Sequence, residues 1–130
     1  MTWAGVFVVL LLSHIAGDFL LQTEWQALNK AGGLGRSREA RRALRNHAIT
    51  YLAAFVPAFV WIATERGDAL PVLLAVLIVL PHAVVDDGRL LRTWMHAVKH
   101  CPDPAPGLVI MVDQSWHLVM LLPVALLAVA

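Results

Sequence analysis

The stretch ALPVLLAVLIVLPHAVV, residues 69–85, decides the fold of this chain because it runs for 17 residues without Asp, Glu, Lys or Arg. A helix needs about 20 mostly apolar residues to cross the hydrocarbon of a membrane, with some latitude at its ends. Three further stretches of 17 to 19 residues, 1–17, 46–64 and 114–130, also lack these charged residues. The sequence therefore predicts four transmembrane helices.

The composition favours lipid over water as the solvent for these helices. Of the 130 residues, 59% are hydrophobic and only 15% are charged, whereas soluble domains are about 45–50% apolar and about 25% charged. In water, a chain this short would leave large apolar patches exposed. We expect one all-α transmembrane domain over residues 1–130, folded as an antiparallel up-down four-helix bundle. The expected spans are about 3–22, 46–64, 69–87 and 108–129.

The cations are distributed unevenly between the connections. Nine of the ten Lys and Arg residues lie in the two longer connections, about 22–45 and 87–107, and only Arg66 lies in the short loop at 64–68. Because cytoplasmic loops carry an excess of Lys and Arg, we expect both basic loops in the cytoplasm and both termini outside. The first span lacks a basic leader and a small-residue cleavage site, so we expect it to stay in the mature protein.

Three of the expected spans carry a His and an Asp four residues apart. The pairs are His14 with Asp18, His82 with Asp86 and, in reversed order, Asp113 with His117, while His47 opens the remaining span. Side chains four apart lie on one face of a helix. In an antiparallel bundle all seven fall toward the cytoplasmic end, so we expect them to converge on one polar pocket.

The free-energy cost of placing charged carboxylates within the membrane must be offset by another interaction. A charged residue at the centre of a membrane helix costs about 2.5–3.5 kcal/mol, whereas structural zinc binding contributes about 10–16 kcal/mol in small peptides. Four imidazoles and three carboxylates are too many ligands for one tetrahedral zinc, but they suit two divalent ions with open positions. Zinc is the first expectation, with manganese or iron as alternatives. The expected ligands are His14, Asp18, His47, His82, Asp86, Asp113 and His117; interhelical hydrogen bonding or a proton relay is the alternative role for these residues.

Polar neighbours of these pairs are candidates to orient ligands or bind substrate: Gln22, Asn29, Lys30, Thr50, Tyr51 and Gln114. Gln22 lies one turn beyond Asp18, and Trp25 and Asn29 continue that stripe if the helix runs on. Thr50 and Tyr51 follow His47 by three and four residues. The alternative for Thr50 is a hydrogen bond to its own helix, and for Lys30 a contact with lipid headgroups.

The segments outside the spans give less specific signals. The basic run RSREARRALR at 36–45 is expected to face anionic lipid, and no nucleic-acid motif accompanies it. His96 and His100 lie beside Cys101, the only cysteine, and are expected to be solvated loop residues rather than a second metal site.

Four segments together resemble a known family. HIAGDFLLQTEWQALNK at 14–30, NHAITY at 46–51, PHAVVDD at 81–87 and DQSWH at 113–117 are similar to the pattern of the bacterial membrane family named domain of unknown function 3307. The resemblance covers nearly the whole chain and implies a bacterial cytoplasmic (inner) membrane protein, but it brings no established activity. The HxxxD of His82 and Asp86 is also similar to a motif of bacterial membrane-bound metal-dependent hydrolases.

Taken with the converging ligands, these features favour a metal-dependent hydrolase of an amphipathic or lipid-linked (phospho)ester. In this hypothesis the metal activates water, and one of the carboxylates of Asp18, Asp86 and Asp113 serves as general base. The alternatives are a di-iron redox enzyme and a non-enzymatic metal or proton carrier or small membrane subunit. The expected partners are membrane lipid and the substrate, with no nucleic acid; a homo-oligomer is compatible with the sequence.

Overall fold

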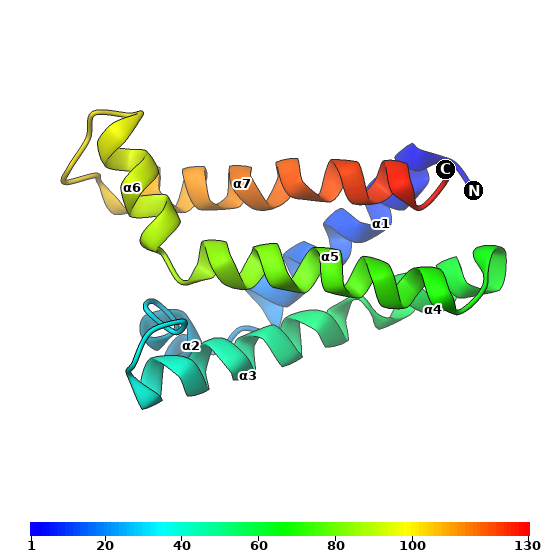
Figure 1. Ribbon diagram of the computed structural model, residues 1–130, viewed down its shortest axis with the longest axis horizontal. Helices are drawn as coiled ribbons and strands as arrows, with labels where there is room; N and C mark the ends of the chain where they lie inside the picture. The colour runs from blue at the N-terminus through cyan, green and yellow to red at the C-terminus, as the bar shows by residue number, and fades with distance from the viewer.

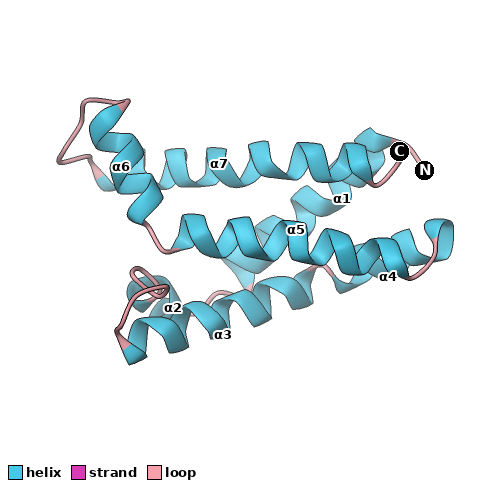
Figure 2. Ribbon diagram, viewed as in Figure 1, coloured by secondary structure: helices cyan, strands magenta, loops and turns pink.

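A computed structural model describes all residues, 1–130, and every regular element in it is helical (Figures 1 and 2). The expected all-α class is confirmed. In chain order the elements are α1 (Trp3–Ile15), the π-helical segment η1 (Ala16–Leu20), α2 (Glu24–Asn29), α3 (Arg38–Ala54), α4 (Val56–Arg66), α5 (Ala69–Asp86), α6 (Arg89–Ala97) and α7 (Pro106–Leu127).

Three helices are long and apolar enough to cross a membrane: the continuous segment Trp3–Leu20, α5 and α7. The pair α3 and α4 is a fourth candidate, with a bend of 49° between its two helices. The bend lies next to Pro57, which lacks a backbone N–H and whose ring clashes with the carbonyl one turn earlier. The chain thus has three to four candidate spans. The fourfold antiparallel arrangement in a membrane stays a prediction.

The long helices enclose an apolar cluster toward the end of the molecule where both termini lie (Figure 1). Helix α7 contacts both α1 and α5, and α5 also contacts α3 and α4. Small side chains at Ala58, Ala125 and Ala128 let these helices approach closely. The cluster consists of Val6, Leu10, Tyr51, Phe55, Ala58, Ile62, Leu74, Ile78, Leu121, Val124, Ala125 and Ala128.

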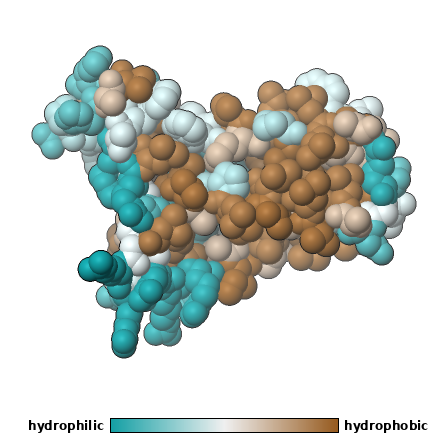
Figure 3. Space-filling view, in the orientation of Figure 1, coloured by the Kyte–Doolittle hydropathy of each residue, from teal (hydrophilic) through white to brown (hydrophobic).

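The outer surface is apolar over the middle of the molecule. Figure 3 shows a broad hydrophobic area bounded by hydrophilic residues at both ends. Large apolar side chains such as Leu12, Val72 and Val119 are more than half exposed there. An exposed apolar band of this kind is typical of a surface that contacts lipid.

Two short helices, α2 and α6, lie in the segments 22–45 and 87–107, for which the sequence predicts connections. Thr23 caps α2 through a capping box with Gln26, so the first span ends at Leu20 and its stripe does not continue to Trp25 and Asn29. Gly88, at φ 76°, allows the chain to reverse into α6. Leu91 and Met95 of α6 pack against Val112 of α7. The end of the molecule opposite the termini is therefore covered by α2 and α6 (Figure 1).

Candidate metal centre

A widened helical turn places Asp18 in the interior. In η1 the N–H of Leu21 donates to the carbonyl of Ala16 at 2.9 Å, five residues back, instead of the usual four. Gly17 lies directly against the ring of Tyr51 on α3, where any larger residue would collide with it. The close approach of these two helices leaves Asp18 only 6% exposed and directed into the bundle. Such π-helical turns are frequent at functional sites.

The structure brings the seven expected ligands together from five elements. His14, His47, His82 and His117 are buried, and so are Asp18 and Asp86. Asp113 is half-buried, with 21% of its side chain exposed. Three overlapping groups have ligand atoms within 4.8 Å of one another: His14 with Asp18 and His82, His47 with His82 and Asp86, and Asp86 with Asp113 and His117.

Four of these side chains lie close together around the Nε2 atoms of His47 and His82, and we call them the enclosed group: Asp18, His47, His82 and Asp86. The Nε2 atom of His47 lies 3.0 Å from Asp86 Oδ2, 3.0 Å from His82 Nε2 and 3.2 Å from Asp18 Oδ1. His82 Nε2 lies 3.1 Å from Asp86 Oδ2 and 3.6 Å from Asp18 Oδ1. Zinc bonds of about 2.0–2.1 Å in tetrahedral geometry separate neighbouring ligands by roughly 3.3–3.4 Å. The five distances are close to this separation of neighbouring zinc ligands.

Hydrogen bonds and ion pairs satisfy this cluster only in part. Asp18 Oδ1 and both carboxylate oxygens of Asp86 are buried without a well-aligned hydrogen bond, although the imidazoles of His47 and His82 pair with both carboxylates and the Lys30 ammonium pairs with Asp86 Oδ1. The Nε2 atoms of His47 and His82 also face each other, so at most one of them can donate to the other. A cation between these atoms would satisfy all four at once.

Gln22 sets the protonation of His47. Its amide satisfies its neighbours when the nitrogen donates to the Asp18 carbonyl at 3.1 Å and the oxygen accepts from Lys30 Nζ at 2.8 Å and from His47 Nδ1 at 3.2 Å. With the proton on Nδ1, the Nε2 lone pair of His47 points into the enclosed group. Residues that surround a metal site commonly fix the tautomer of a histidine ligand by hydrogen bonding to the ring nitrogen that does not bind the metal.

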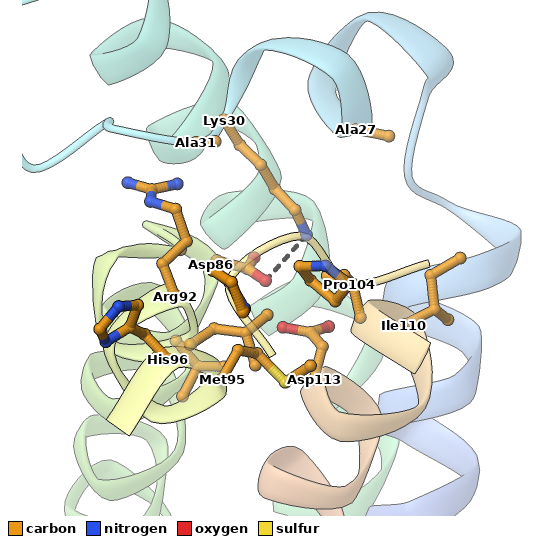
Figure 4. Close-up of a pocket in the computed structure, with 15 residues that line it drawn as sticks. Ala27, Lys30, Ala31, Asp86, Arg92, Met95, His96, Pro104, Ile110 and Asp113 are labelled. Atoms are coloured by element: carbon orange, nitrogen blue, oxygen red, sulfur yellow. Dashed lines mark ion pairs between the residues drawn. The ribbon is translucent and has the colours of Figure 1, made fainter. Parts of the chain in front are cut away.

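A second set, the open group, consists of Asp86, Asp113 and His117. His117 Nδ1 donates to the Asp113 carbonyl at 2.8 Å, which leaves its buried Nε2 without a hydrogen bond, 3.8 Å from Asp86 Oδ1. Asp86 thus turns one oxygen to each group. The ammonium of Lys30 lies 2.8 Å from Asp86 Oδ1 (Figure 4). The Asp86 carboxylate of the open group therefore pairs with one cation of the chain itself, the ammonium of Lys30.

The remaining expected site residues divide into those that contact the cluster and those that do not. His14 is hydrogen-bonded at both nitrogens, to the Tyr51 hydroxyl at 3.1 Å and to Gln114 Oε1 at 2.9 Å. Gln114 also donates to Asp18 Oδ2 at 3.3 Å and to Asp113 Oδ2 at 3.2 Å. The ring of Tyr51 stacks on His82 with centroids 3.5 Å apart. Tyr51 and Gln114 therefore position the side chains of the cluster, whereas His14 belongs to a candidate ligand group with Asp18 and His82 and stays a predicted ligand.

Thr50 and Asn29 do not contact the cluster. The Thr50 hydroxyl donates to the carbonyls of Asn46 and His47 in its own helix, which was the alternative for this residue. Asn29 donates to the Trp25 carbonyl at the surface, because the chain breaks after Leu20. Neither side chain therefore bonds to a ligand side chain in this structure.

Asp87 fastens the loop that carries Lys30 to the end of α5. Its backbone carbonyl accepts from Gly32 N at 2.9 Å, and its Oδ1 accepts from Leu34 N at 2.8 Å. Arg89 donates to the other oxygen, and this hydrogen bond holds the pKa of Asp87 below its usual range. The contacts fix Lys30 beside Asp86.

We expect Asp87→Ala to lower the free energy of unfolding by about 1–3 kcal/mol, because Leu34 N–H loses its buried acceptor. Asp87→Asn keeps an acceptor oxygen and should lose less. Since the folded pKa is lowered, the contribution of the charge is complete above the ordinary pKa of 3.8 and is lost as pH falls through the lowered value. Thermal denaturation of the purified variants between pH 3 and 7 measures both effects. Equal midpoints for wild type and Asp87→Ala at pH 7 would contradict this role.

A cavity of about 530 Å³ adjoins the open group (Figure 4). Asp86 and Asp113 form one wall, and Lys30, Arg92 and His96 provide nitrogen atoms around it. Arg92 and His96 are not among the site residues that the sequence predicts, because it predicts a connection between spans at 87–107. The signal was their spacing of four residues, which places both on one face of α6.

This arrangement has the chemistry of a metal site with two unlike positions. The enclosed group offers two imidazoles and two carboxylates, as in a closed four-ligand site. The open group offers three ligands next to a cavity, which is the pattern of sites that keep one position for water or substrate. These buried His and Asp residues can therefore hold a metal ion.

One comparison with known proteins identifies the family of this chain. The chain matches the family described as Protein of unknown function (DUF3307) over residues 6–130. No curated protein and no solved structure matches it. Since the match covers nearly the whole chain and includes every His and Asp of the two groups, the protein is a member of the DUF3307 family.

Proposed function

We propose that this protein is a membrane-embedded, metal-dependent hydrolase of an amphipathic or lipid-linked ester, with one ion in the enclosed group and a second in the open group. The observation that carries the proposal is that the enclosed group, whose four side chains are joined by close contacts, lies next to a three-ligand group that faces a cavity. Ions at these positions would supply Lewis-acid chemistry and activate water. Zinc suits the mixed imidazole and carboxylate donors.

Asp113 is the residue that we assign as general base. It is the only carboxylate of the two groups with an appreciably exposed side chain, and it lines the cavity. Oδ2 accepts from Gln114, and Oδ1 makes no hydrogen bond. One oxygen can therefore bind an ion while the other takes a proton from water.

A carrier is less well supported than an enzyme. The polar cluster is closed on the side of the termini by the apolar cluster around Leu10, Phe55 and Leu74, which contains no ionisable side chain other than Tyr51. A transport path needs polar groups across the whole membrane. The arrangement favours a site that is reached from one side.

The proposal is tested with purified protein in neutral detergent and a panel of short-chain carboxylic and phosphoric esters. We expect turnover that disappears on chelation and returns with zinc. Asp113→Asn should lower turnover by about 10²–10⁴-fold. Asp103→Asn, an exposed carboxylate in the connection before α7, is the matched control and should leave it unchanged. Absence of bound metal, or turnover unaffected by chelation, would contradict the hydrolase; bound iron with visible absorption would favour a redox enzyme.

The site is proposed to face the cytoplasm of a bacterium, because the basic loops lie at its end of the molecule. Cys101, the single cysteine and partly exposed, tests this orientation. We expect a membrane-impermeant maleimide to label it in inside-out vesicles and not in intact spheroplasts. Asp68→Cys in a Cys101→Ser background, at an exposed position in the short loop, should show the reverse. The same labelling of Cys101 in both preparations would contradict the orientation.

A further inference from the structure

The cavity beside the open group is lined by charged and by apolar side chains. Lys30 and Arg92 come from different segments, the loop after α2 and the helix α6, and both line the cavity near Asp86 (Figure 4). Lys30 is committed to Asp86 at 2.8 Å. The Arg92 guanidinium makes no ion pair or hydrogen bond within the chain, and it lies over Gly88, where a Cβ atom would come within 3.2 Å of Nη1. An unpaired guanidinium beside a lysine is suited to an anion.

Apolar side chains also line the cavity, among them Leu91, Met95 and Val109. Ile110 lines it too, lies across it from Arg92 in Figure 4, and is 56% exposed on α7. An aliphatic chain could therefore lie along these side chains while its head remains at Lys30 and Arg92. A free inorganic anion would leave the apolar side chains uncovered.

The net charge of the site indicates which polar head group the cavity would bind. If the proposed function is correct and both groups hold divalent ions, three carboxylates face two such ions together with Lys30 and Arg92. The site then carries an excess of positive charge, which a phosphate group neutralises better than a neutral ester. Arg pairs with phosphate through two parallel hydrogen bonds.

We infer that the cavity binds an alkyl phosphate, with the phosphate between Lys30, Arg92 and the open group and the chain along the apolar side chains. This inference rests on the proposed function and names its substrate class. Hydrolysis of such an ester forms a bond between the water oxygen and phosphorus and breaks the bond between phosphorus and the alkyl oxygen. One water proton passes through Asp113 to the departing alkoxide, and the products are an alcohol and inorganic phosphate.

Binding is measured by calorimetry with hexylphosphonate, whose carbon–phosphorus bond is not hydrolysed, on zinc-loaded protein in neutral detergent. Inorganic phosphate and hexanol are the probes for the head and the chain alone. We expect hexylphosphonate to bind more tightly than either. Arg92→Gln and Lys30→Gln should each weaken it by about tenfold or more, the usual effect of losing a hydrogen bond to a charged group. The matched control is Lys99→Gln, which removes a charge just after α6 from a side chain outside this cavity, and it should bind as wild type does.

The outcomes separate this inference from the hydrolase. Hexylphosphonate affinity that is the same in Arg92→Gln and wild type overturns the anion site, and inorganic phosphate binding as tightly as hexylphosphonate overturns the alkyl chain. If binding depends on Arg92 but no ester is cleaved, the anion site stands and the hydrolase fails. If esters without phosphate are cleaved at equal rates by wild type and Arg92→Gln, the hydrolase stands and the inference fails.

Discussion

Asp86→Ala is expected to abolish metal binding altogether, whereas the wild-type protein should hold two divalent ions per chain. Asp86 is the ligand that the two groups share, since Oδ2 faces His47 and His82 while Oδ1 faces His117. Residues that only orient metal ligands contribute about 10–100-fold to metal affinity, so the loss of a shared direct ligand should exceed this for both ions. Elemental analysis of protein purified without chelator measures the ion content.

Variants of one group should each remove one ion. Asp18→Ala affects the enclosed group and Asp113→Ala the open group, so each variant should retain about half of the wild-type content. Asp103→Ala is the matched control and should retain both ions. Wild-type protein without metal would refute the centre. Wild-type protein that holds a single ion, with the same content in Asp113→Ala, would refute the open position while leaving the enclosed one intact.

Gly17→Ala should both destabilise the protein and lower its metal content. A Cβ at this position would lie 2.6 Å from Cδ2 of Tyr51 and 3.2 Å from its Cα, and the Tyr51 backbone cannot easily yield. Overpacking of this kind typically costs about 1–3 kcal/mol. Because Asp18 is the next residue and Tyr51 stacks on His82, the shift would also displace two ligands of the enclosed group. Thermal denaturation and elemental analysis of the same preparation measure both losses.

Gly107→Ala is the control for this substitution. Gly107 lies in the first turn of α7, and a Cβ there would meet nothing within 4 Å. The replacement should leave metal content unchanged and be neutral or slightly stabilising, since alanine favours a helix over glycine by up to about 1 kcal/mol. A Gly17→Ala variant that melts and binds metal like Gly107→Ala would show that the two helices are not so closely packed.

The convergence of the ligands could be predicted from the sequence because two simple regularities determine it. Long apolar stretches define helices, and a spacing of four residues places His14 with Asp18 and His82 with Asp86 on single faces. Antiparallel neighbours then bring the polar ends together. These regularities say nothing about the break after Leu20, although the capping box of Thr23 and Gln26 was visible in the sequence.

The details around the ligands depend on contacts that spacing does not encode. Thr50 has the right position but bonds to its own helix, because the carbonyl one turn earlier is always within reach. Arg92 lies in a segment with too few apolar residues to suggest a span, and only the packing of Leu91 and Met95 on Val112 brings it to the cavity. The division into an enclosed and an open group follows from the orientation of the Asp86 carboxylate. This orientation depends on tertiary packing and cannot be predicted from residue spacing.

Tyr51 belongs both to the apolar cluster and to the surroundings of the ligands. Its ring lies against Phe55 on one side and against His82 on the other, and its hydroxyl reaches His14. The apolar cluster and the cluster of His and Asp side chains thus meet at the side chain of Tyr51. A change in the packing of the apolar cluster around Phe55 would therefore also shift the imidazoles of His14 and His82, which couples the packing of one end of the molecule to the geometry of the other.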